Sequence, residues 1–277
     1  MNLIMDSTFK RVIFVVITVA IGILILYTAI FYMPQQNQTA IVIYLIVVQF
    51  LVLTTFFAFR DQHAYRMRSV KKLKNPRLQE NAFEFMKLIL KDYDYIRDTL
   101  AQAMNDRHTM VNYFLLITGA VITIVATNLN ADALQEEQAR YILFIGALVL
   151  NFIGWIYFMH IIRLRQAWHG SAMAMNQIKE FFVQNGRIPD DIARSSFLWD
   201  TKTVPKAGRK SNVFYYSAML ISFISSFVLI FASFISLPVE STHVIPLFSW
   251  LIGLYHFIFQ MICFSLFLDY VSRRRWA

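Results

Sequence analysis

The chain has 277 residues, of which 57% are hydrophobic and only 16% are charged, and its formal net charge is +9. Soluble domains carry about 25% charged residues, so this composition argues against a soluble globular protein. The single cysteine, Cys263, excludes a disulfide or a cysteine-based metal site within one chain.

Long stretches without charge decide the fold class. Six apolar runs contain no Lys, Arg, Asp or Glu, and they cover 12–33, 40–59, 111–129, 141–162, 212–237 and 244–268. Each run is long enough to cross a hydrocarbon core of about 30 Å as an α-helix. The sequence therefore predicts an all-α polytopic membrane protein with six transmembrane helices arranged as three hairpins.

The first hairpin, predicted for 1–59, is followed by a basic stretch, "RDQHAYRMRSVKKLKNPR" at 60–77. This stretch anchors the inner end of the second helix under the positive-inside rule. Its basic side chains are also candidates for binding anionic lipid headgroups or other phosphate groups. These residues are Arg66, Arg68, Lys71, Lys72, Lys74 and Arg77. No aromatic ladder or Gly-rich loop accompanies them, so nucleic acid is not an expected partner.

The central part, 60–185, combines a membrane hairpin with an amphipathic extension. Apolar residues recur in 4-3 spacing from Ala82 to Met110, interrupted by Arg107. This heptad-like pattern predicts a helix that continues without a break into the run at 111–129. A second stripe follows the run at 141–162 and should end near Asn185-Gly186. The two extensions are predicted to form an antiparallel cytoplasmic stalk, although the heptad seam could equally serve assembly between chains.

The remaining parts are a cytoplasmic linker at 186–211 and a third transmembrane hairpin at 212–277.

The orientation in the membrane follows from the distribution of the basic residues. Alternate segments between the apolar runs hold 25 Lys and Arg on one side and 1 on the other. Both termini and both long loops are therefore predicted to be cytoplasmic, in a multi-pass protein of the cell's inner (plasma) membrane.

Polar residues inside the apolar runs are the candidate site. They are Asn112, Thr123, Asn151, His160, His256 and Gln260. Such side chains avoid lipid, so they either line a pore or substrate path, or they pack helices together within one subunit. For His256 the packing alternative is an interhelical hydrogen bond to the serine-rich face of the run at 212–237.

An acidic group lies in the predicted outer loop of the central hairpin. Asp132, Glu136 and Glu137 would form an acidic ring at the outer mouth of an oligomer, where it favours cations. The alternative is an ordinary solvated hairpin tip.

Nucleotide-binding loops, nucleophile elbows and zinc motifs do not occur in the sequence. The protein is therefore not expected to be an enzyme, and no cofactor or metal is expected.

Two stretches carry a family resemblance. "YIRDTLAQAMNDRHTMVNYFLLITGAVIT" and "RLRQAWHGSAMAMNQI", within 80–184, resemble the SLATT family of two-transmembrane effector domains associated with nucleotide-signalling defence systems in bacteria. The resemblance implies an oligomeric pore in the inner membrane, opened when a cytoplasmic protein or a nucleotide second messenger engages the cytoplasmic part. The hairpins on either side are not part of that pattern.

Three classes of function remain open at this point. The first is a homo-oligomeric channel or effector gated through the cytoplasmic helices. The second is a non-catalytic membrane anchor, sensor or adaptor whose stalk docks a cytoplasmic partner. The third is a small transporter, which predicts a cavity at the bilayer midplane and a broken helix.

Overall fold

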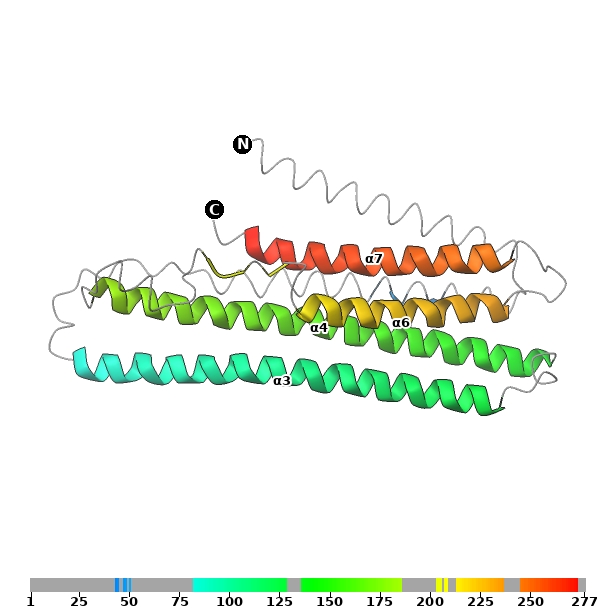
Figure 1. Cartoon of the computed structure of the whole chain (residues 1–277), viewed down its shortest axis with the longest axis horizontal. Helices are drawn as coiled ribbons and strands as arrows, with labels where there is room; N and C mark the ends of the chain where they lie inside the picture. Colours follow the sequence, from blue (N-terminus) through cyan, green and yellow to red (C-terminus); the bar gives the residue numbers. More distant parts are fainter. Residues whose placement is uncertain are drawn as a thin grey trace, which may run out of the picture.

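The computed structural model describes four helices, labelled in Figure 1: α3 (Ala82–Asn128), α4 (Glu137–Asn185), α6 (Val213–Ser236) and α7 (Ile245–Arg273). It also describes 136, 203–205, 207–208 and five helical residues of the run at 40–59, namely Ile43, Tyr44, Val47, Val48 and Phe50. These residues contain no strand, which confirms the all-α class for the described part of the chain. Most of the first predicted hairpin, the basic stretch at 60–77 and most of the linker lie outside the described residues.

All four helices are long and apolar enough to cross a membrane. The candidate spans are Lys87–Thr127, Glu137–Val183, Val213–Ser236 and Ser249–Leu268. They overlap four of the six predicted apolar runs. The composition of the sequence and the length of the helices thus agree that the protein is embedded in a membrane.

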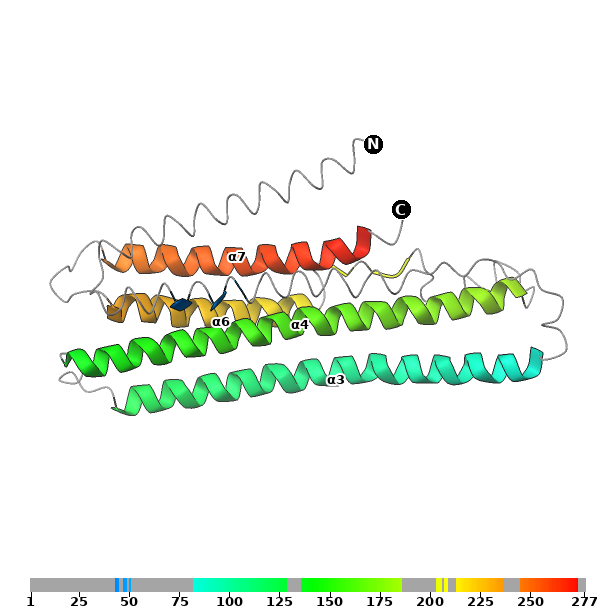
Figure 2. The same cartoon turned by 180° about the vertical axis from the view of Figure 1, so that it is seen from behind.

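α3 and α4 are much longer than a bilayer requires. They contain 47 and 49 residues, which corresponds to about 70 Å each at 1.5 Å per residue. α3 runs without a break from its amphipathic part into its apolar part, and α4 ends at Asn185, as predicted. The two helices lie side by side and antiparallel, and they extend beyond α6 and α7 at one end (Figures 1 and 2).

The core lies where α4 packs against α6 and α7. Its largest fully buried side chains include Trp155 and Phe158 of α4, Ile221 of α6 and Phe264 of α7, and Phe114 joins them from α3. Lipid chains are as apolar as these side chains, so close packing stabilises the contact more than removal from water does. Gly154 shows how close the approach is, because a Cβ built there would lie 1.8 Å from Oγ of Ser225.

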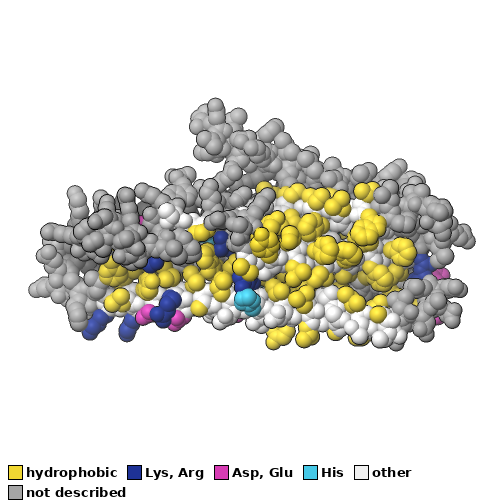
Figure 3. Space-filling model, in the orientation of Figure 1, with side chains coloured by type: hydrophobic (Ala, Val, Ile, Leu, Met, Phe, Trp, Pro, Cys, Tyr) yellow, Lys and Arg dark blue, Asp and Glu magenta, His cyan; other side chains and the backbone are white. Residues whose placement is uncertain are grey.

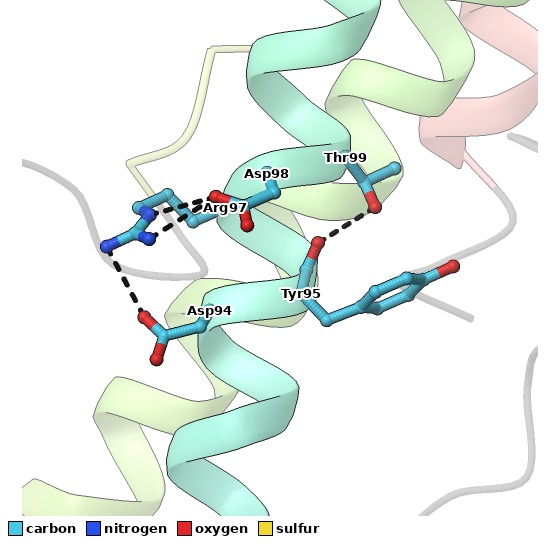
Figure 4. Close-up of polar contacts among 5 residues, drawn as sticks. All are labelled: Asp94, Tyr95, Arg97, Asp98 and Thr99. Carbon is cyan, nitrogen blue, oxygen red and sulfur yellow. Dashed lines mark hydrogen bonds and ion pairs between the residues drawn. The ribbon is translucent and has the colours of Figure 1, made fainter.

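Charge is separated along the long axis of the molecule. Figure 3 shows a broad apolar surface over the half that contains α6 and α7, with charged side chains at the tip of that half and along the other half. On α3, Arg97 pairs with Asp94 and with Asp98, each at 3.3 Å (Figure 4). These side chains are mostly exposed, so the pairs contribute little stability. They mark this part of α3 as water-facing.

Candidate functional site

The six polar residues predicted within the apolar runs fall into two groups. Asn151, His256 and Gln260 are buried inside the subunit. Asn112, Thr123 and His160 are exposed on the outer faces of α3 and α4. The structure therefore does not gather the six side chains into one site.

Asn151 joins α4 to two neighbours. Its Nδ2 donates a hydrogen bond of 2.6 Å to the carbonyl of Ser225 on α6, and its Oδ1 accepts one from the hydroxyl of Tyr44. Gly154, three residues later, allows α6 to approach closely enough for the first of these bonds. The amide of Asn151 thus serves helix packing within one subunit.

His256 links α6 to α7. Its Nδ1 lies 2.9 Å from Oγ of Ser226, and its ring lies perpendicular to that of Trp155 with centroids 5.5 Å apart. This confirms the predicted hydrogen bond to the serine-rich face. Gln260, one helical turn further along α7, is fully buried in the same interface.

One face of α3 is left open by this packing. In the most apolar stretch of α3 only 11% of the residues are buried, against 50% in α4. Asn112, Gly119 and Thr123 are separated by seven and four residues, so they share one exposed face. Thr123 satisfies its hydroxyl by donating to the carbonyl of Gly119 at 2.9 Å. Asn112 has an exposed amide with no hydrogen-bond partner among the described residues.

This face also has room for a side chain at its glycine. A Cβ built at Gly119 would meet no other atom within 4 Å, and the same holds for Gly146 on an exposed face of α4. A small residue is therefore not required at either position by packing within the subunit. Gly119 differs from Gly146 because it lies on the same face as Asn112 and Thr123. We call the exposed residues Asn112, Gly119, Thr123 and Thr127 the α3 face.

The charged candidates are only partly described. Glu136 and Glu137 are exposed at the start of α4, and the carbonyl of Glu136 accepts the first backbone hydrogen bond from Arg140 at 3.1 Å. Asp132 lies outside the described residues. The same is true of the predicted phosphate-binding residues Arg66, Arg68, Lys71, Lys72, Lys74 and Arg77.

The sequence did not single out two buried arginines that meet where the long helices leave the apolar runs. Arg107 of α3 and Arg165 of α4 are each 2% exposed, and their guanidinium carbons lie 5.1 and 5.6 Å from the centre of the Phe214 ring. Arg165 also donates a hydrogen bond of 3.0 Å to the carbonyl of Ala207. The sequence did hold one signal for this junction. Arg107 is a charged residue that interrupts the apolar heptad pattern of α3.

Both arginines keep their charge, because a guanidinium stays protonated in proteins. Arg165 stacks on Trp168 at 4.5 Å, and Arg107 contacts His108 and donates to the sulfur of Met104 at 3.9 Å. These contacts tie α3, α4, the start of α6 and the segment around Ala207 together at one junction.

Within the described residues, no group of three or more His, Cys, Asp or Glu side chains is placed to hold a metal ion. Comparison of the whole chain with protein-family models, with curated proteins and with solved structures found no match.

Proposed function

We propose that the protein is a homo-oligomeric membrane channel in which the α3 faces of neighbouring subunits meet around a shared axis. The observation that carries this proposal is the exposed amide of Asn112 within an apolar run. An unpaired amide is costly in lipid, so it requires either water or a second helix. An oligomer built on the α3 face supplies both.

The rest of the α3 face supports the same arrangement. Gly119, Thr123 and Thr127 are small or satisfy their own hydroxyls, and such residues let membrane helices approach closely. Asn151 of α4 and Nδ1 of His256 on α7 each make a hydrogen-bonding contact with α6, and both side chains are buried within the subunit. The α3 face is therefore the better candidate for a polar path than the interior of one subunit.

The proposal includes an orientation. The surplus of Lys and Arg in alternate segments favours six transmembrane helices as three hairpins, with the termini and the extended ends of α3 and α4 in the cytoplasm. The extended ends then form the stalk through which the channel is gated. The junction at Arg107 and Arg165 connects that stalk to the start of α6. The SLATT resemblance suggests a bacterial inner membrane, and a cytoplasmic protein or a nucleotide as the gating partner.

Leu116 is a candidate gate. It is 67% exposed and follows Asn112 by four residues, so it lies on the same side of the helix as the α3 face. A ring of leucines closes a narrow pore by excluding water from it. In the proposed oligomer, Leu116 holds the pore closed until the stalk moves.

A crosslinking experiment tests the interface. The chain has one native cysteine, which is buried, so Cys263→Ala provides a cysteine-free background. In that background we expect Gly119→Cys to form covalent dimers under mild oxidation of membranes. Gly146→Cys is the matched control, because both glycines are exposed and open. Crosslinking at Gly146 but not at Gly119, or at neither position, would contradict an interface on the α3 face.

The adaptor alternative rests on a different surface. Leu88 and Tyr95 are 64% and 71% exposed on the charged half of α3 and lie seven residues apart on one side of the helix. A cytoplasmic protein could dock there with or without a pore. A small transporter is less well supported, because α3, α4, α6 and α7 each run without a break.

A further inference from the structure

The hydrogen bonds of Ser226 determine the protonation of His256. The hydroxyl of Ser226 lies 2.7 Å from the carbonyl of Ser222, to which it donates, and 2.9 Å from Nδ1 of His256. A hydroxyl has one proton to donate, so Nδ1 must donate to the Ser226 oxygen. Ser226 and Trp155, which contact the ring among the described residues, are both neutral, so we assign the neutral form of His256, in which Nε2 is an acceptor.

Several buried polar atoms near this bond have no partner among the described residues. They include Nε2 of His256, both amide atoms of Gln260 and Oγ of Ser222. The side chains of Gln260 and Ser222 are fully buried. Unpaired polar atoms in a buried place destabilise a fold, so these four call for a partner other than the described side chains.

The register of the two helices brings these atoms together. Ring contacts of Tyr215 with Phe264 and of Phe227 with Trp250 show that α6 and α7 pack antiparallel. Ser226 pairs with His256, so Ser222, one turn earlier, lies level with Gln260, one turn later. One turn is 5.4 Å, which is about the length of two successive hydrogen bonds through one small molecule.

The chemistry of the set defines the missing partner. It must donate to Nε2 of His256 and both donate to and accept from the Gln260 amide and the Ser222 hydroxyl. It must be neutral, because the set contains no charged side chain. We infer that the α6–α7 interface holds a buried water site in which water donates to His256 and bridges Gln260 and Ser222. The site lies within one subunit and does not depend on the proposed oligomer.

Magnetic resonance on the full-length wild-type protein tests the site directly. The protein is labelled with ¹⁵N-glutamine and placed in phosphatidylcholine nanodiscs, and magnetisation is transferred from water protons to glutamine side-chain amides. The Gln260 signal is identified by its loss in Gln260→Met. We expect transfer to Gln260 as well as to Gln102, which is exposed on α3. Transfer to Gln102 without transfer to Gln260 would overturn the water site.

The melting temperature of Gln260→Met gives a second test, because a dry and a hydrated interface predict changes of opposite sign. If the interface were dry, Gln260→Met would remove two unpaired atoms and raise the melting temperature. With water bound, the same substitution breaks satisfied hydrogen bonds and lowers it. Gln166→Met is the control, because Gln166 makes a long hydrogen bond of 3.5 Å to the carbonyl of Phe267 and should change the melting temperature less. A rise or no change for Gln260→Met would contradict the site, whereas a monomeric protein would contradict only the proposed channel.

Discussion

The guanidinium of Arg140 donates a hydrogen bond of 2.7 Å to the carbonyl of Ile235, one residue before α6 ends at Ser236. The end of a helix presents unpaired carbonyls and a negative partial charge, which a nearby cation stabilises. Arg140 is also the single basic residue in the predicted outer loops. Its contact with α6 gives a structural reason for this one departure from the positive-inside pattern.

Replacement of Arg140 should weaken the α4–α6 contact. We expect Arg140→Ala to lower the free energy of unfolding by about 1–2 kcal/mol, because a charged hydrogen bond to a helix end is lost. Chemical unfolding of the purified protein in detergent, followed by circular dichroism, measures the change. Arg97→Ala is the control: its ion pairs are exposed, so its effect should stay below about 0.5 kcal/mol. Equal losses of unfolding free energy in the two variants would show that Arg140 does not stabilise the end of α6.

Gly154 should be intolerant of a side chain. A Cβ there would overlap with Oγ of Ser225, so Gly154→Leu forces α4 and α6 apart. We expect a loss of about 2–3 kcal/mol in the free energy of unfolding, typical of overpacking. Gly146→Leu adds the same side chain where no atom lies within 4 Å, and it should leave the melting temperature nearly unchanged. Similar destabilisation by both substitutions would contradict the close approach of α4 and α6.

Leu116 tests the gate. In liposomes that contain the purified protein, Leu116→Ser should raise the basal ion flux by about tenfold or more, because a polar ring no longer excludes water. Ile122→Ser is the matched control on α3, since Ile122 is 55% exposed but lies off the α3 face. Raised flux through the Ile122 variant alone would place the pore on another face of α3. Raised flux through neither variant would argue against a pore lined by α3.

The acidic outer mouth is tested by ion selectivity in the Leu116→Ser background. Neutralising Glu136 and Glu137 with glutamine should shift the reversal potential in a potassium chloride gradient toward lower cation preference, because acidic rings concentrate cations. Asp92→Asn removes one exposed carboxylate from the charged half of α3 and should leave the reversal potential unchanged. An identical reversal potential after the double substitution would favour an ordinary solvated hairpin tip.

The sequence predicted the four described helices well because hydrophobicity and helix-ending residues are local signals. The absence of charge at 111–129 and 141–162 marked two apolar runs, and Asn185-Gly186 marked the end of α4. The unbroken passage of α3 from heptad stripe to apolar run also followed from residues close together in the chain. Each of these predictions needs no knowledge of what lies opposite the helix.

The candidate site could be predicted only in part, because it depends on which helix covers which face. Asn112 and Asn151 carry the same amide group and lie in similar apolar runs. The side chain of Asn151 donates a hydrogen bond to the carbonyl of Ser225, whereas that of Asn112 is exposed. Helical periodicity assigns each residue to a face, but the partner of that face comes from residues far away in the chain. The junction of Arg107 and Arg165 at Phe214 was missed for the same reason.

The central claim is that α3 faces meet in an oligomer, and the mass of the detergent-solubilised protein tests it most directly. Light scattering with the detergent contribution subtracted should give one discrete multiple of the 32.4 kDa chain, three or greater. Gly119→Leu should reduce that mass to one chain, whereas Gly146→Leu should leave it unchanged. A monomeric wild-type protein, or an oligomer that survives Gly119→Leu intact, would contradict the proposed channel.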